Sequence, residues 1–395
     1  VHQDKSTPLV AFNLLYDVGA RDEDPTRTGF AHLFEHLMFG GSVNINNYDE
    51  IVEKAGGQNN AFTSNDFTNY YITLPKENLE QAFRLESDRM LSLAFTPKSL
   101  EVQRQVVVEE FKQNYLNQPY GDIHLLLRPL AYKKHPYQWP TIGKEVSHIE
   151  NATMDEVKSF FYKHYAPNNA ILVVAGDVEL DQVKYLSEKW FGSIERRKYH
   201  VRNIPTEPMQ TKARILKVER DVPVDVIYKA FHMCARTHED FFATDLISDI
   251  LSRGHSSRLN HSLVKEQKLF TNIDAFVGSS IDNGLFYFAG KLAPNITMQE
   301  AERGIDAEIN KLQANLVSDN ELRKVKNKVI SAHMISELNV LNKAMNLATS
   351  ELIGAANLVN KQIDLYEAVT SDKIMTIAQD IFRKENSNTL YYHAK

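Results

Sequence analysis

A chain of 395 residues is long for a single hydrophobic core and predicts two domains of ordinary size. Its composition, 43% hydrophobic and 24% charged, is typical of a soluble globular protein. The net charge is a mild −6 and no basic stripe is present, which argues against nucleic acid as a partner. No apolar run approaches the roughly 20 residues of a membrane span. The single Cys234 excludes an internal disulfide and a cysteine-based zinc site.

The first predicted element is a strand at residues 8–18, "PLVAFNLLYDV". The sequence starts at Val1 in what looks like the middle of a strand and carries no signal peptide. We therefore expect that the chain has been trimmed at its N-terminus, so that a targeting segment could have been lost.

A helix with two histidines and a glutamate on one face is predicted at residues 29–41, "GFAHLFEHLMFGG". Helical residues advance about 100° each, so His32 and His36 lie about 40° apart and Glu35 falls about 60° to the other side of His32. Two imidazoles one turn apart can both reach a metal ion. A solitary polar residue at a helix edge would be unremarkable, but this pair with its glutamate favours a metal site. The order His-x-x-Glu-His is the reverse of His-Glu-x-x-His and is that of the inverted zinc peptidases.

A catalytic zinc usually has three protein ligands, and a second predicted helix at residues 99–116 offers a third. Its apolar stripe comprises Leu100, Val106, Val107, Phe111 and Tyr115. Glu110 lies about 80° from the centre of that stripe and Glu109 nearly opposite it, so Glu110 can point inward. The pattern of this helix alone leaves open that both carboxylates are solvated.

The second half of the chain repeats the plan of the first. A predicted strand at residues 222–234 is followed by "ARTHED" and an apolar helix at 241–254, as the first strand is followed by "GARDED" and the histidine helix. Asp245, Ser248 and Asp249 fall near the places of the two histidines and the glutamate. We predict an α+β fold of two similar domains, each an antiparallel-rich sheet packed with helices. The predicted boundaries are 1–195 for the zinc-binding domain, 196–212 for a charged linker and 213–395 for the second domain.

These motifs resemble the pitrilysin/insulinase family of zinc peptidases, in particular its processing-peptidase-like and bacterial members. The resemblance covers nearly the whole chain and includes the segments "GGQNNAFTSNDFTNYY", "KKHPYQWPTIG", "YAPNNAILVVAGDV" and "SSRLNHSLVKEQKLF". It implies one zinc ion per chain, held by His32, His36 and Glu110, with Glu35 as the general base. It also implies that Asn60, Ala61 and Phe62 form an edge strand that pairs with an extended peptide, although the same residues could belong to a simple surface hairpin.

Two departures from the family pattern affect these expectations. Gln103 stands where many relatives carry another glutamate, seven residues before the distal ligand and on the same helix face, so it can form hydrogen bonds but supplies no charge. Val264 and Thr271 stand where the family's second domain often supplies an Arg and a Tyr to the substrate. We therefore expect a two-chain assembly with a related chain that lacks the zinc motif but carries that Arg and Tyr, or else a homodimer.

The function that these features predict is a zinc-dependent endopeptidase acting on short or unfolded peptides. The alternatives are a non-catalytic structural subunit of a processing-peptidase-like complex and a metal-binding protein without turnover, which the presence of Glu35 argues against. We expect the bacterial periplasm rather than the cytoplasm as its compartment.

Overall fold

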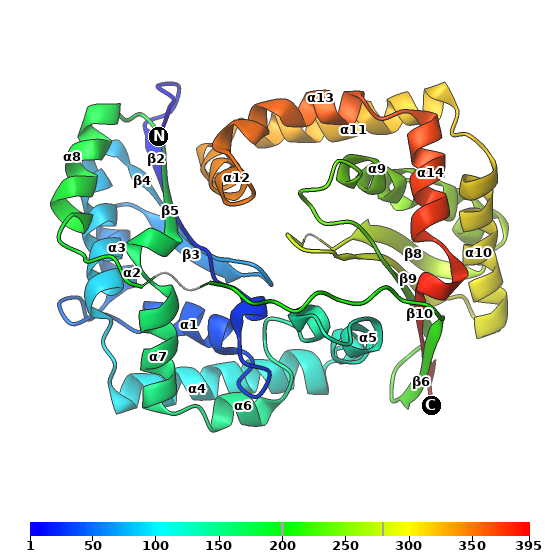
Figure 1. Ribbon diagram of the computed structural model, residues 1–395, viewed down its shortest axis with the longest axis horizontal. Helices are drawn as coiled ribbons and strands as arrows, with labels where there is room; N and C mark the ends of the chain where they lie inside the picture. Colours follow the sequence, from blue (N-terminus) through cyan, green and yellow to red (C-terminus); the bar gives the residue numbers. More distant parts are fainter. Residues whose placement is uncertain (199–200, 279) are drawn as a thin grey trace. The chain divides into compact units, whose positions relative to one another are not determined.

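The computed structural model describes residues 1–198, 201–278 and 280–395, which form two compact units (Figure 1). The predicted α+β fold of two sheet-and-helix domains is confirmed, because each unit contains one five-stranded sheet packed with helices. In the described part of the chain, no helix has both the length and the hydrophobicity needed to cross a membrane.

Each unit gathers segments that are distant in the sequence. Unit 1 comprises Val1–Asn117, His135–Pro205 and Met334–Asn360, and unit 2 comprises Gln118–Lys134, Thr206–His333 and Lys361–Lys395. The predicted division at residues 196–212 therefore needs two corrections: the short segment after residue 117 belongs to the second unit, and a helix near residue 345 belongs to the first.

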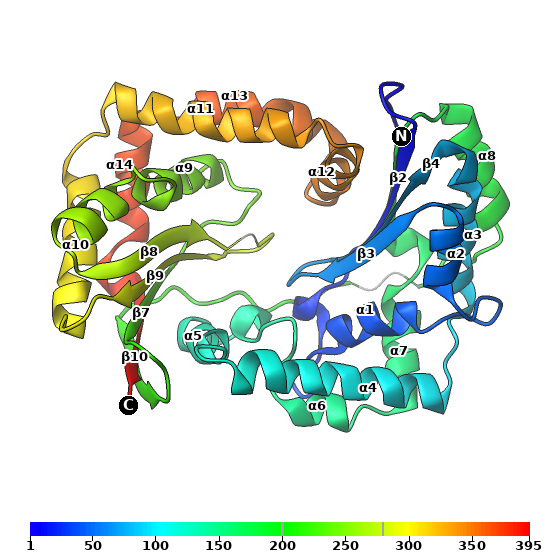
Figure 2. The same cartoon turned by 180° about the vertical axis from the view of Figure 1, so that it is seen from behind.

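The sheet of unit 1 has the strand order β1-β5-β2-β4-β3. Its strands are β1 (His2–Gln3), β2 (Leu9–Tyr16), β3 (Gln58–Thr63), β4 (Thr68–Pro75) and β5 (Ala170–Gly176). All neighbours are antiparallel except β1 and β5. Strand β3 pairs with β4 in the register Asn60 to Tyr71 and forms an edge of the sheet (Figure 2).

Helices cover both faces of this sheet. Successive side chains of a strand point to opposite faces, and apolar side chains lie on each of the two. On one face, Phe12 of β2 packs edge-on against Phe83 of helix α3 (Leu79–Ser92), with ring centroids 4.9 Å apart. The helices of the unit besides α12 are α1 (Phe30–Phe39), α2 (Tyr48–Lys54), α3 (Leu79–Ser92), α4 (Pro97–Phe111), α6 (Val146–Glu150), α7 (Met154–His164) and α8 (Leu180–Phe191).

The other face of the same sheet explains why a helix from late in the sequence belongs to unit 1. Helix α12 (Val340–Leu352) places Val340, Ala344 and Ala348, one turn apart, on the buried side chains of β2 and β5. Small residues at this spacing allow close approach of a helix to a sheet, and the burial removes apolar surface from water. An amphipathic pattern in the sequence indicates that a helix is buried on one side but not which sheet it covers.

Unit 2 has the strand order β6-β10-β7-β9-β8. Its strands are β6 (Arg214–Arg220), β7 (Val226–His232), β8 (Phe270–Val277), β9 (Leu285–Leu292) and β10 (Ser387–Ala394). Its helices are α5 (Ile123–Ala131), α9 (Phe241–Ser252), α10 (Met298–Ala314), α11 (Asp319–Ser336), α13 (Gln362–Glu367) and α14 (Ser371–Ile381). The only parallel pair among its neighbours is β6 with β10, which matches β1 with β5. The two sheets thus share one topology, as the internal repeat in the sequence predicts.

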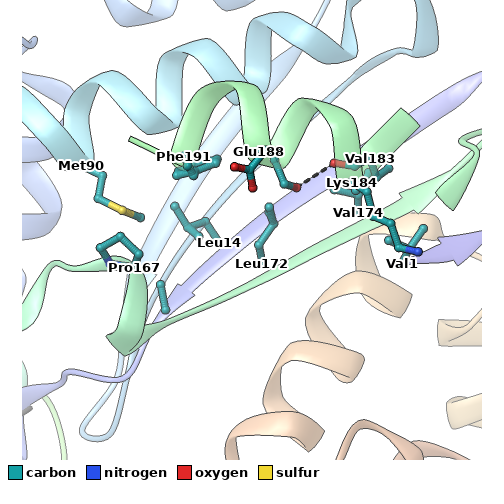
Figure 3. A pocket seen from close by; sticks show the side chains of 13 residues that line it. Val1, Leu14, Met90, Pro167, Leu172, Val174, Val183, Lys184, Glu188 and Phe191 are labelled. Carbon is teal, nitrogen blue, oxygen red and sulfur yellow. Dashed lines mark hydrogen bonds between the residues drawn. The ribbon is translucent and has the colours of Figure 1, made fainter. Parts of the chain in front are cut away.

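Unit 1 also contains a cavity of about 600 Å³ between α8 and the sheet (Figure 3). Leu14, Leu172 and Val174 form its floor, and Lys184 and Glu188 of α8 line it as well. None of the residues predicted to bind metal or peptide lines this cavity, so the cavity is separate from the candidate site.

Candidate metal centre

The histidine helix is confirmed as α1, and its two ends are defined by glycines. Gly29 precedes it with a φ of +91°, a left-handed conformation that L side chains rarely adopt, and Gly40 ends it. Because Gly29 has no side chain to cap the helix, its first N–H groups need another acceptor. Glu23 supplies it: its two carboxyl oxygens accept from the backbone N–H groups of Gly29 and Ala31, both at 2.9 Å.

The carboxyl group of Glu23 is buried and takes a third hydrogen bond, from Nε1 of Trp139 at 3.0 Å. Burial raises the pKa of Glu23 to about 8, although its N–H donors favour the ionised form. Sequence reasoning missed this residue. The local signal was present, because an acidic residue just before a predicted helix favours the positive end of the helix dipole.

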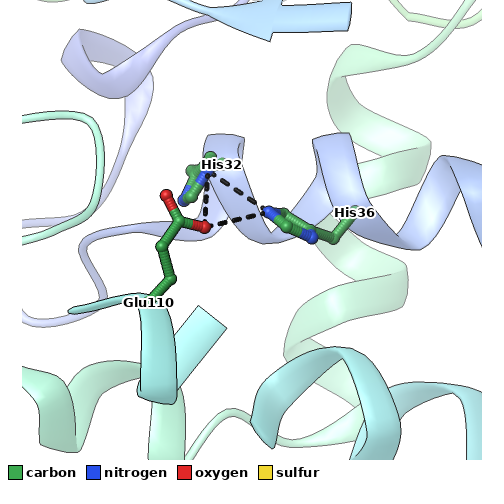
Figure 4. Close-up of side chains that lie close together, drawn as sticks. All are labelled: His32, His36 and Glu110. Carbon is green, nitrogen blue, oxygen red and sulfur yellow. Dashed lines mark hydrogen bonds and ion pairs between the residues drawn. The ribbon is translucent and has the colours of Figure 1, made fainter. Parts of the chain in front are cut away.

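The structure brings His32, His36 and Glu110 together at one point (Figure 4). Nε2 of His32 lies 3.3 Å from Nε2 of His36, and Oε2 of Glu110 lies 3.6 Å and 3.4 Å from these two nitrogen atoms. Ligands at 2.0–2.1 Å from a tetrahedral zinc are separated from one another by about 3.3–3.4 Å. The three atoms therefore have the spacing of three corners of a zinc tetrahedron. Within the described residues, this is the one group of three or more His, Cys, Asp or Glu side chains close enough to share a metal ion.

The protonation states of two of these groups also suit metal binding. Burial lowers the pKa of His32, opposed by the nearby charge of Glu110, and so favours the neutral imidazole. The hydrogen bond from His36 lowers the pKa of Glu110, against the effect of burial, and keeps that carboxylate ionised. Neutral imidazole and ionised carboxylate are the forms that coordinate a metal.

Helix α4 directs Glu110 toward α1 and Glu109 toward solvent, as the helix-face argument predicts. The Glu109 side chain is 72% exposed and pairs with Lys112 at 3.0 Å, whereas the Glu110 side chain is 35% exposed. The predicted apolar stripe was wrong at Val106, which is exposed, while Val108 is buried. The buried arc is rotated because α4 packs against both α1 and α6.

Glu35 is on the same helix, directly before His36, and is not one of the three clustered side chains. Its Oε2 accepts a hydrogen bond of 2.6 Å from the hydroxyl of Thr63, the last residue of β3. Sequence reasoning missed Thr63, although it follows directly on the predicted peptide-binding residues. No spacing rule connects two residues 28 positions apart on a helix and a strand.

Asn60, Ala61 and Phe62 all lie on β3, the edge strand of the sheet. Asn60 and Phe62 are exposed and Ala61 is buried, as expected for alternating side chains. The backbone N–H of Ala61 donates to Oδ1 of Asn60 at 2.8 Å. An edge strand offers backbone groups along its outer side that can pair with another strand.

Gln103 is not brought into this cluster. Its amide nitrogen lies beside Gly40, where a methyl group on the glycine would come within 3.9 Å of it. Among the described residues, no hydrogen bond joins Gln103 to His32, His36 or Glu110.

Val264 and Thr271, which the resemblance is expected to place at an Arg and a Tyr of the family, both contact other residues of unit 2. Val264 packs against the core of unit 2, and the Thr271 hydroxyl donates to the backbone oxygen of Lys291 at 3.3 Å. Arg258, which is near them in sequence, forms two hydrogen bonds of 2.9 and 2.7 Å with Glu321. Its guanidinium group is therefore committed to a contact within unit 2.

Comparison with known proteins gives two adjacent family matches. A model described as insulinase (peptidase family M16) matches residues 1–145, and one described as the peptidase M16 inactive domain matches residues 151–329. The first range contains His32, Glu35, His36 and Glu110, and the second range contains none of them.

Individual relatives match over nearly the whole chain. The chain is 31% identical to zinc protease PqqE of Helicobacter pylori, over 98% of this chain and 88% of that protein. It is 24% identical to the uncharacterized zinc protease YmxG of Bacillus subtilis, over 95% and 91% of the two chains. The crystal structure of a protease from Helicobacter pylori superposes with a TM-score of 0.92 at 29% identity, covering 98% of this chain and 95% of that one.

Proposed function

The chain belongs to the insulinase family, peptidase family M16, and on that premise we propose that it is a zinc-dependent endopeptidase that cleaves short or unfolded peptides. The observation that carries the proposal is the spacing of 3.3–3.6 Å between the ligand atoms of His32, His36 and Glu110. The names of the two relatives described above, both zinc proteases, support zinc as the metal.

The donor set of the site fits zinc better than a harder cation. Two imidazole nitrogens and one carboxylate are ligands that zinc accepts, whereas calcium and magnesium prefer oxygen ligands alone. Three protein ligands also leave a tetrahedral position open, as in catalytic rather than structural zinc sites. Bound there, zinc would supply a Lewis acid that polarises the scissile carbonyl and lowers the pKa of a water molecule toward about 7.

The residues of the chain would perform the remaining work of hydrolysis. Glu35, next to the ligands, accepts the proton of the attacking water and delivers it to the leaving amine. The exposed edge of β3 holds the substrate as an added strand, through backbone groups such as the N–H of Ala61. Pairing through the backbone tolerates many sequences, which suits extended or unfolded peptides. No covalent intermediate is needed.

The test is to measure the metal content of the purified chain together with cleavage of a quenched peptide mixture. We expect about one zinc per chain, hydrolysis that a chelator abolishes, and recovery when zinc is restored. Glu35→Gln should retain the zinc and lose the activity. A chain that binds zinc but shows no hydrolysis that depends on Glu35, alone or with a partner chain, would instead support the non-catalytic subunit.

A further inference from the structure

The hydrogen bond between Thr63 and Glu35 connects the proposed base to the proposed peptide-binding strand. The hydroxyl of Thr63 donates to Oε2 of Glu35 over 2.6 Å. This is within the 2.5–2.7 Å range of hydrogen bonds from a hydroxyl to a charged carboxylate, which are about twice as strong as neutral ones. One oxygen atom of the carboxylate is thereby held by the end of β3.

We propose that Thr63 is a positioning residue that aligns Glu35 with the reacting water and couples that alignment to peptide binding on β3. The inference rests on the proposed function, because it assigns a role in the same site. It goes further than that proposal because it names Thr63 as the residue that orients Glu35, and β3 as the element that links this orientation to peptide binding.

Thr63 is suited to hold a carboxylate because its own position is tightly fixed. Threonine is branched at Cβ, so few side-chain rotamers are open to it. Its backbone pairs with Thr68 across the hairpin, and the turn that follows is closed by hydrogen bonds from the backbone N–H and the hydroxyl of Ser64 to the carbonyl of Phe67, both at 2.9 Å. The donor therefore sits at the rigid end of the hairpin.

The same turn is tied to the segment that caps α1. The backbone N–H groups of Ala20 and Arg21 donate to the carbonyls of Ser64 and Asn65, at 3.2 and 2.8 Å. Two residues after Arg21, Glu23 accepts hydrogen bonds from the backbone N–H groups of Gly29 and Ala31 at the start of α1. The start of the helix that carries Glu35 and the end of the strand that carries Thr63 are thus both held by the segment 20–23.

A fixed carboxylate matters because general base catalysis depends on short distances. The base must lie within about 2.6–3.2 Å of the proton that it takes, and a displacement of about 1 Å can cost about 10²-fold in rate. With Oε2 held by Thr63, the other oxygen of Glu35 is left to receive the proton. Without the hydroxyl, the carboxylate can rotate among conformations that do not face the water.

The coupling follows from the order of residues along β3. Asn60, Ala61 and Phe62 would pair with the peptide, and Thr63 is the next residue on the same strand. The four residues are consecutive on one strand, so a peptide that pairs with β3 further restricts the position of the Thr63 hydroxyl relative to Glu35. A well-paired peptide would then be cleaved faster and not merely bound more tightly.

The experiment compares Thr63→Val, which removes the hydroxyl at nearly constant shape, with Thr63→Ser, which keeps it. Loss of a hydrogen bond to a charged group predicts a fall in kcat of about 10- to 100-fold for Thr63→Val. KM and zinc content should stay close to the wild-type values, and Thr63→Ser should recover most of kcat. Thr63→Ala serves in place of the valine variant if that one does not fold.

Two controls separate positioning from a general weakening of the hairpin. Thr73→Val alters a hydroxyl on the neighbouring strand and should leave kcat unchanged. In the described part of the chain, the one hydrogen bond of this hydroxyl goes to the Gln58 carbonyl, at 3.5 Å. In a Glu35→Gln background, Thr63→Val should leave the dissociation constant of a bound peptide unchanged, a measurement that does not depend on turnover. A rise in KM or in that constant at constant kcat would show that Thr63 acts only on binding and would overturn the inference.

The outcome also distinguishes this inference from the proposed function. If the wild-type chain hydrolyses peptides and Thr63→Val does so at the same rate, the inference is wrong and the endopeptidase proposal stands. If neither the wild-type chain nor its mixture with a partner shows hydrolysis that depends on Glu35, both are wrong.

Discussion

Replacement of Glu110 by Gln, compared with replacement of its neighbour Glu109 by Gln, is the most direct test of the metal centre. Both changes remove one negative charge from adjacent positions of α4. Only the first removes a carboxylate oxygen that lies 3.6 and 3.4 Å from the two histidine nitrogens. Zinc sites with four ligands bind with about 10–16 kcal/mol, so one of them contributes about 2.5–4 kcal/mol. At about 1.4 kcal/mol per factor of ten, Glu110→Gln should weaken zinc binding by about 10²–10³-fold.

The Glu109 side chain is largely exposed, and among the described residues its ion pair is with Lys112, a surface contact worth about 0–1 kcal/mol that lies outside the proposed zinc site. Glu109→Gln should therefore leave the zinc affinity within a few-fold of the wild-type value. Competition with a chromogenic chelator measures both affinities, and circular dichroism shows that the variants are folded. Equal losses of affinity from the two changes, or a greater loss from Glu109→Gln, would refute the assignment of Glu110 as the third ligand.

Three further predictions concern catalysis, the capped helix and assembly. Glu35→Gln should keep about one zinc per chain and lower kcat by about 10²–10⁴-fold, which is the usual contribution of general acid–base catalysis to the rate. Activity close to that of the wild type would mean that another group moves the proton. Because the pKa of Glu23 is raised to about 8 from an ordinary value near 4.5, its contribution to stability is fully present below about pH 4.5 and is lost as the pH rises to about 8. The free energy of unfolding of the wild type relative to Glu23→Gln should thus fall between pH 5 and 8, by at most about 5 kcal/mol, and a pH-independent difference in denaturant titrations would contradict it. Because Val264 and Thr271 cannot supply an Arg and a Tyr, the chain should work as a dimer or with a related chain that carries them; a monomer in sedimentation experiments that cleaves at full rate, unaffected by such a partner, would show otherwise.

The parts of the site that could be predicted from the sequence are those fixed by local geometry. His32 and His36 are one helical turn apart, so their meeting depends only on the formation of α1. The choice of Glu110 over Glu109 followed from the angle between adjacent residues of one helix. The same argument failed at Val106, because the buried arc of α4 is set by two packing partners, α1 and α6, that the pattern of a single helix does not reveal.

The parts that could not be predicted depend on contacts between distant segments. The bond between Thr63 and Glu35 joins a strand end to a helix face, and no pattern within either segment specifies it. Helix α12 lies within the range 213–395 that was predicted for the second domain, because that prediction divided the chain at a single point. Its Ala344 and Ala348 nevertheless pack on the first sheet, since that sheet has a second apolar face to cover. Local patterns identify buried faces, and the partners of those faces come from the tertiary structure.

Unit 2 has the same strand topology as unit 1 but lacks the candidate metal-binding side chains, so the two can be compared. Its helix α9 follows strand β7 as α1 follows β2, and carries Asp245 and Asp249 one turn apart. Asp245 accepts a hydrogen bond of 2.7 Å from Tyr366, and Asp249 one of 3.2 Å from Arg253, while burial raises the pKa of both. A metal ion there would have to displace Arg253 and Tyr366 from carboxylates that burial already disfavours as anions. The same topology therefore carries the cluster that we propose to bind zinc in one unit and a set of internal hydrogen bonds in the other. A few side chains make the difference: two histidines, one inward glutamate, and a second glutamate that is held by a threonine.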